Sequence, residues 1–130
     1  MPPFLSPEWM RRADALLVEA DNLTVTGAPL TIEQTVTADG RDPIRYHLRF
    51  DEAGARLHEG PADAPTVTLA LDYGVAAAVA RGEVSAQVAF QSGDIRVGGD
   101  MQRLIAHRDQ ITTSDDVLGP LRADTEWAGA

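Results

Sequence analysis

Two runs of strictly alternating side chains, separated by the dipeptide Asp39-Gly40, constrain this chain more than any other feature. Alternation with a period of two is typical of a strand that has one buried and one solvated face. An Asp-Gly pair between two such runs favours a tight turn. The pattern therefore predicts an antiparallel hairpin whose inward side chains are Leu30, Ile32, Gln34 and Val36 on the first strand and Ile44, Tyr46, Leu48 and Phe50 on the second.

A third short strand is expected at 55–59, after the turn at 51–54. A slip of one residue would turn every side chain to the opposite face, so the apolar faces determine the register. Leu48 should then lie opposite both Ile32 and Leu57. The three strands form a meander with one apolar and one polar face, which is typical of a sheet that helices cover on one side only.

Capping residues mark the helices. Helices are expected to begin after Ser6, Asp72, Ser85 and Asp100, whose side-chain oxygens can accept from free backbone N–H groups. Gly82 and Gly93 are suited to end the second and third of these. Strands are predicted at 67–71 and 94–97, and the two intervening helices predict a right-handed crossover that places both strands in one sheet. The last clear helix is expected to contain Met101, Leu104, Ile105 and Arg108.

Charge and composition exclude several classes of function. The net charge is −9, all eleven basic residues are arginine, and cysteine is absent. Nucleic acids and anionic membranes attract lysine and arginine, so we expect neither nucleic-acid binding nor stable membrane association. Without lysine or cysteine there is no Schiff base, thiolate nucleophile or disulfide.

The length of 130 residues predicts a single domain, 1–130. Within it we expect an N-terminal helix at about 6–20, the sheet and its helices at about 23–110, and a polar, less regular tail at 111–130. No secretory signal and no apolar run of membrane-spanning length is visible, which favours a cytoplasmic location.

The segment from Gly82 to Leu104 resembles the signature of the sterol carrier protein 2 (SCP2) family. The residues that carry the resemblance are Gly82, Gln87, Ala89, Phe90, Gly93, Ile95, Val97, Gly99, Asp100 and Leu104. The resemblance extends weakly upstream through the alternating strands. With its all-arginine composition and its final Trp-Ala-Gly-Ala, which lacks the peroxisomal targeting tripeptide of animal members, the chain looks like a bacterial stand-alone member.

The resemblance implies an α/β (α+β) fold: a five-stranded mixed sheet, helices covering one face, and an apolar tunnel between them. It also implies a non-catalytic carrier without a cofactor, whose partner is an apolar small molecule such as a fatty acid, an acyl-CoA or a sterol-like compound. The expected ligand-binding residues are Leu48, Phe50, Leu69, Ala76, Val79, Val88, Ala89, Phe90, Ile95, Met101, Leu104 and Ile105.

A second reading of the same residues stays open. Alanines crowd the helices that should cover the sheet, and small side chains there can either leave a dry cavity or let helix and sheet pack closely. With a filled core, the protein would be an interaction or accessory protein for a partner enzyme, or a homodimer, with no ligand.

Few residues are candidates for metal binding, for recognition of an acidic group or for catalysis. The register places His47 opposite Glu33 and His58 on the outward face, where two imidazoles and a carboxylate could bind zinc. Polar residues belong on such a face in any case, so we predict no metal site there. One of Arg81, Arg96 and Arg103 could meet a ligand's acidic group, although a solvated arginine is the simpler interpretation. Trp9 and Trp127 could close the mouth of the tunnel, but core and tail packing is the simpler interpretation, and no catalytic motif is present.

Overall fold

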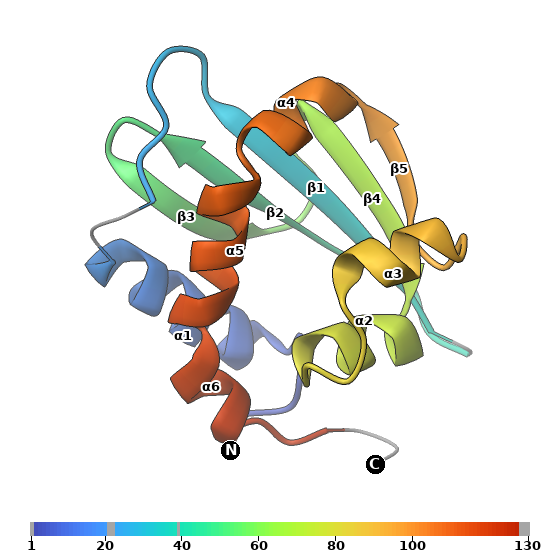
Figure 1. The fold of residues 1–130 in the computed structure, drawn as a ribbon. Coiled ribbons are helices and arrows are strands. Elements are labelled where there is room, and N and C mark those ends of the chain that lie inside the picture. The colour runs from blue at the N-terminus through green and yellow to red at the C-terminus, as the bar shows by residue number, and fades with distance from the viewer. Residues whose placement is uncertain (1, 21–22, 39, 128–130) are drawn as a thin grey trace.

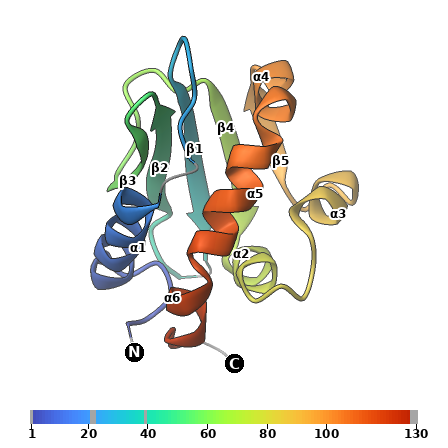
Figure 2. The ribbon, with the colours of Figure 1, turned by 60° about the vertical axis from the view of Figure 1, so that its left-hand side comes forward.

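The computed structural model describes residues 2–20, 23–38 and 40–127. Five strands form one mixed sheet in the order β3-β2-β1-β4-β5. The helices α1, α2 and α5 lie on the same side of this sheet (Figures 1 and 2). The strands are β1 (Leu30–Thr37), β2 (Ile44–Asp51), β3 (Gly54–Glu59), β4 (Val67–Asp72) and β5 (Arg96–Gly99). The helices are α1 (Pro7–Glu19), α2 (Tyr73–Ala80), α3 (Ala86–Gln91), α4 (Met101–Ala106), α5 (Arg108–Val117) and α6 (Gly119–Ala123).

The meander β1-β2-β3 has the predicted register. Leu48 pairs with Ile32 on one side and with Leu57 on the other, and both neighbours are buried. Asp39, on which the predicted turn depends, lies outside the described residues. The antiparallel hairpin and the third strand are confirmed, because the apolar faces permit no other alignment.

The predicted crossover between the fourth and fifth strands is wrong. β4 and β5 share the sheet as neighbours, but they are antiparallel, whereas β4 runs parallel to β1. The short helices α2 and α3 lie at the end of the sheet where β4 finishes and β5 starts (Figure 1). They return the chain to that same end, so β5 runs back along β4. β5 also begins at Arg96, two residues after the predicted Asp94.

The four predicted capping residues each accept a hydrogen bond at a helix start. The bonds run from Trp9 N to Ser6 Oγ, Val75 N to Asp72 Oδ1, Val88 N to Ser85 Oγ and Arg103 N to Asp100 Oδ1, at 3.2, 2.8, 3.1 and 3.2 Å. Gly82 follows α2 with a φ of 77°, the left-handed conformation that glycine adopts without strain. These local signals were sufficient to locate the helix starts.

The prediction of an irregular tail from residue 111 is also wrong. The chain continues as α5 and α6, and the last clear helix is divided at His107, between α4 and α5. Leu121 is fully buried and Ser114 is buried as well. The apolar residues of this segment are few and separated by polar ones, so periodicity alone does not identify the face that packs inward.

Helix α1 supplies a hydrogen-bond acceptor to the backbone of β3, the strand at the open edge of the sheet. Asp14 on α1 accepts from the Leu57 backbone N–H at 2.9 Å and from two nitrogens of Arg56 at 2.8 and 2.9 Å. A free edge strand invites pairing with another chain, so a side chain that occupies its N–H discourages such pairing. These hydrogen bonds from Arg56, reinforced by the one from Leu57, hold the pKa of Asp14 below its usual value although burial opposes the shift.

We expect Asp14→Ala to lower the free energy of unfolding near neutral pH by roughly 1.5–3 kcal/mol, the usual contribution of hydrogen bonds to a charged group. Because the pKa of Asp14 is depressed in the folded state, this stabilisation is present above the unfolded carboxyl's pKa and is lost as pH falls through the folded value. Urea denaturation at neutral and acidic pH measures the difference. Asp115→Ala, which breaks the exposed pair with Arg122, is the control and should change stability by less than about 1 kcal/mol. If the difference in free energy of unfolding between wild type and Asp14→Ala stays the same at acidic pH, the proposed role of the Asp14 carboxylate is wrong.

Aromatic side chains gather where the two ends of the described chain meet. Phe4 packs against Trp9, Tyr73 and Trp127 with ring centroids 5.2, 5.5 and 4.8 Å apart. Pro3 and Glu126 form a parallel bridge, and Trp9 Nε1 donates to Thr125 Oγ1 at 3.1 Å. We call Phe4, Trp9, Tyr73 and Trp127 the aromatic cluster. Both predicted packing tryptophans belong to it.

In the part of the chain that the structure describes, no helix is both long enough and apolar enough to cross a membrane.

Candidate functional site

A row of helix-facing side chains crosses the middle of the sheet without being fully covered. Gln34 on β1 pairs with Tyr46 on β2 and with Leu69 on β4, and Leu69 pairs with Val97 on β5. We call Tyr46, Gln34, Leu69 and Val97 the middle row. Of these four, only Tyr46 is buried, and the other three are half-buried.

The rows on either side of the middle row are closed on β1 and β4, whereas Leu48 and Ile44, which continue them on β2, are half-buried. Ile32 and Val67 are buried on one side, and Val36 and Leu71 are buried on the other. On β1 and β4 the helix layer therefore covers the rows above and below the middle row but leaves Gln34 and Leu69 partly accessible. Apolar side chains near the end of the chain are also only half-buried against the core: Leu104 on α4, Ile111 and Val117 on α5, and Leu118 between α5 and α6.

The structure divides the sequence-predicted ligand-binding residues into two groups. Nine of them lie in the core or at its partly covered margin: Phe50, Ala76, Ala89 and Ile95 are buried, and Leu48, Leu69, Val79, Met101 and Leu104 are half-buried. The other three are on the surface, where Val88, Phe90 and Ile105 are 52%, 43% and 58% exposed. α3 and α4 are each only six residues long, Ala89 is the one buried residue of α3, and no residue of α4 is buried.

The sequence pattern did not identify α5 or Gln34 as parts of the candidate ligand site. Ile111 and Val117 were assigned to an irregular tail, so their inward positions had no basis in the pattern. Gln34 stood in the predicted inward set, and a polar residue in an apolar alternation was the signal that could have identified it.

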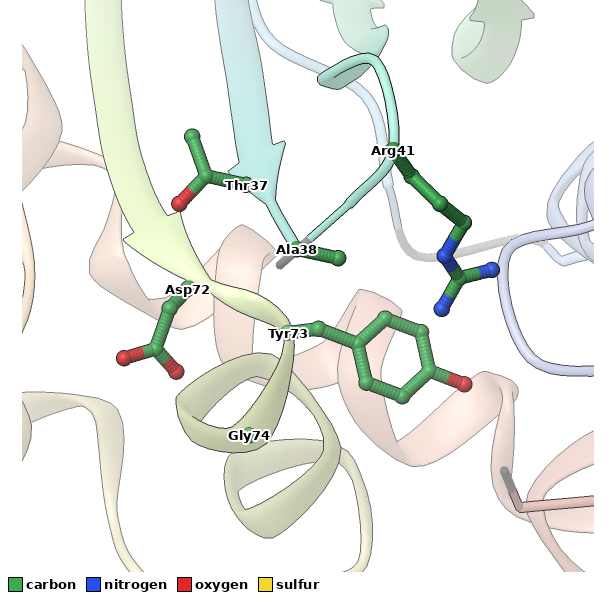
Figure 3. Close-up of a pocket in the computed structure, with 6 residues that line it drawn as sticks. All are labelled: Thr37, Ala38, Arg41, Asp72, Tyr73 and Gly74. Atoms are coloured by element: carbon green, nitrogen blue, oxygen red, sulfur yellow. The ribbon is translucent and has the colours of Figure 1, made fainter. Parts of the chain in front are cut away.

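A separate recess of about 480 Å³ opens at the ends of β1 and β4. It is lined by Thr37, Ala38, Arg41, Asp72, Tyr73 and Gly74. Figure 3 shows Arg41 beside the Tyr73 ring, whose centroid is 5.4 Å from the guanidinium carbon, while Asp72 points the other way. None of the predicted ligand-binding residues lines this recess.

The predicted histidine row is present on the outward face. His47 pairs with Glu33 and with His58, and the two imidazole centroids are 5.3 Å apart. His47 Nδ1 donates to the Gly60 carbonyl at 3.0 Å, and Glu33 Oε1 accepts from Ala62 N at 2.9 Å. Within the described ranges, no group of three His, Cys, Asp or Glu side chains is placed to hold a metal ion.

The arginines near the predicted tunnel have different surroundings. Arg103 donates to the carbonyls of Ala28 and Pro29 at 2.7 and 3.0 Å, so it ties α4 to the loop before β1. Arg81 pairs with Glu83 at 3.2 Å and lies over the Trp127 ring. Arg96 is exposed on β5. Arg103 thus has a structural role.

Several solved structures with this fold are described as sterol carrier proteins, and one is an alkyl sulfatase. The crystal structure of sterol carrier protein 2 has a TM-score of 0.70 at 17% identity, over 88% of this chain and 95% of that one. The solution structure of palmitated SCP2L2 from Aedes aegypti has a TM-score of 0.61 at 14% identity, over 86% and 94%. A mutant of the sec-alkyl sulfatase PisA1 has a TM-score of 0.60 at 17% identity, over 81% of this chain but 16% of the enzyme.

These identities are low, so the similarities show a shared fold. No curated protein matches the sequence. A family model does match it: the model for the SCP-2 sterol transfer family covers residues 20–107, which is most of the chain and includes β1–β5. The chain therefore belongs to the SCP-2 sterol transfer family.

Proposed function

We propose that this protein binds an apolar small molecule, such as a fatty acid, an acyl-CoA or a sterol-like compound, between its sheet and its helices, and that it carries this ligand without catalysing a reaction. The observation that carries the proposal is the incomplete cover over the middle row. Half-buried Leu69 and Val97 on the sheet and half-buried Leu104 and Ile111 on α4 and α5 would supply the apolar surface that the ligand contacts.

The physical basis of affinity is burial of the ligand's chain, at about 25 cal/mol per Å² of apolar surface removed from water. The palmitated relative from Aedes aegypti supports a ligand of this class for the shared fold. We also propose that the ligand lies enclosed in a tunnel and that the protein is cytoplasmic.

Leu69→Trp is expected to weaken binding of a fluorescent fatty acid at least tenfold, because the indole would occupy the space over the middle row. Leu69 is half-buried, so the larger ring has room to enter without unfolding the protein, whereas Ala89, at 1% exposure, has no such room. Fluorescence titration measures binding, and thermal unfolding monitors the fold.

Val18→Trp is the matched control, because Val18 is 58% exposed on α1 and its replacement should leave binding unchanged. Full binding by a folded Leu69→Trp protein would exclude the space over the middle row as the site.

A second candidate function is that of an accessory protein for a partner enzyme, or of a homodimer. Val84, Val88 and Phe90, in α3 and the loop before it, are exposed apolar side chains that a partner could cover. The occurrence of this fold as a small part of the sulfatase supports the same idea. Native mass spectrometry separates the two: bound lipid on a monomer favours the carrier, and a lipid-free complex favours the accessory protein.

A further inference from the structure

A single polar side chain interrupts the helix-facing surface of the central strand. On β1, Ile32 and Val36 on either side of Gln34 are buried and apolar, and Gln34 shares the middle row with Leu69. Placing an amide among apolar groups costs free energy unless its donors and acceptor find partners. The hydrogen bonds of Gln34 therefore show what this position is suited to do.

The oxygen of the Gln34 amide already has a partner. The Tyr46 hydroxyl donates to Gln34 Oε1 at 2.7 Å. Tyr46 is 8% exposed, and burial raises the pKa of its hydroxyl, so it stays protonated and remains a donor. This bond orients the amide, with its oxygen directed to Tyr46.

The nitrogen of the same amide is available. Among the described residues Gln34 Nε2 has no hydrogen-bond partner, although an amide nitrogen carries two donors. It is not completely buried, because Gln34 is half-buried and Arg81 Nε is the only side-chain nitrogen or oxygen in the described residues that is both buried and without a partner. The middle row thus presents an oriented donor within an apolar surface.

We propose that Gln34 Nε2 donates a hydrogen bond to a neutral oxygen of the ligand, such as that of a ketone, an ester or an alcohol, and that Tyr46 positions Gln34 for this role. The inference rests on the proposed function, since it requires a ligand over the middle row. It narrows the ligand class to neutral lipids that carry an acceptor oxygen.

The preference for a neutral oxygen follows from the surroundings. The four residues of the middle row are uncharged, and the residue that continues the row on β3, opposite Tyr46, is the exposed acid Glu59. A carboxylate placed beside Gln34 would therefore lose its hydration without gaining a cationic partner from that row. A ketone or hydroxyl oxygen loses much less on burial and gains the donated bond. A site of this kind selects against the ionised end of a fatty acid.

The test compares three lipids with similar chain lengths. The full-length protein, freed of lipid, is incubated with an equimolar mixture of hexadecan-2-one, palmitate and hexadecane, and the retained lipids are extracted and quantified by mass spectrometry. We expect wild type to enrich the ketone over hexadecane by about 3- to 10-fold, the effect of one hydrogen bond. Gln34→Leu should remove this enrichment and still retain hexadecane.

Gln87→Leu is the matched control, because Gln87 is exposed on α3 and the same substitution there should leave the ketone enriched. Equal enrichment of the ketone by wild type and Gln34→Leu would overturn the role of Gln34, and stronger retention of palmitate would overturn the preference for a neutral oxygen. If wild type retains none of the three lipids, the proposed function itself fails.

Should Gln34→Leu not fold, wild type supplies a second readout. The side-chain amide signals of Gln34 in a ¹⁵N-labelled sample should shift when hexadecan-2-one is added and should shift much less with hexadecane. Equal shifts with both lipids would contradict a hydrogen bond from Gln34.

Discussion

Replacing Phe50 with alanine is expected to lower the free energy of unfolding by about 3–5 kcal/mol. Phe50 is fully buried on β2, where it pairs with Leu30 on β1 and Ala55 on β3. Removing the ring takes away buried apolar surface and leaves a cavity that its neighbours can fill only in part. Since natural domains are stable by about 5–15 kcal/mol, much of the protein's stability would be lost.

Phe90→Ala is the matched control for that substitution. Phe90 is 43% exposed, so the same change of side chain should cost less than about 1 kcal/mol. Denaturation in urea measures both, and a shifted midpoint with an unchanged slope identifies a loss of stability rather than a change in compactness. Similar losses for the two variants would mean that the core is not centred on the helix-facing side of β2.

Gly99→Ala is the second substitution for which we expect a large effect, a loss of at least about 3 kcal/mol. Gly99 ends β5 with a φ of 88°, which is strained for any residue with a side chain. A Cβ atom there would also lie 2.4 Å from the Thr66 carbonyl oxygen and 3.2 Å from Val67 Cα. Both neighbours are backbone atoms and cannot rotate away, so β5 would have to move from β4.

Gly119→Ala provides the comparison. Gly119 begins α6, and a Cβ atom added there meets no other atom within 4 Å. Because alanine favours the helix over glycine, this variant should be unchanged or more stable by up to about 1 kcal/mol. Chemical denaturation measures the stability of both, and hydrogen exchange at β5 locates the damage in Gly99→Ala. A Gly99→Ala protein as stable as wild type would contradict the close approach of β5 to Thr66.

The part of the fold that depends on local pattern could be predicted from the sequence. Ile32, Leu48 and Leu57 had to face the same side, and that requirement alone determined the pairing of three strands. The caps Asp72 and Asp100 could be identified because each needs only a side-chain oxygen before a helical segment.

What could not be predicted depends on contacts between distant segments. The direction of β5 follows from how α2 and α3 turn the chain, and their sequence pattern does not encode that path. α5 is helical although its apolar residues are sparse, since its packing against α1 and α6 outweighs its weak periodicity. Gln34 was predicted to face inward, but only the bond from Tyr46 shows which end of its amide is available.

The aromatic cluster determines what intrinsic fluorescence can report. The chain has two tryptophans, Trp9 and Trp127, and both pack on Phe4 beside the bridge between Pro3 and Glu126. Emission from the wild-type protein therefore reports on the junction of the chain ends. The middle row contains no tryptophan, so occupancy there is better followed with a labelled ligand or an isotope-labelled Gln34.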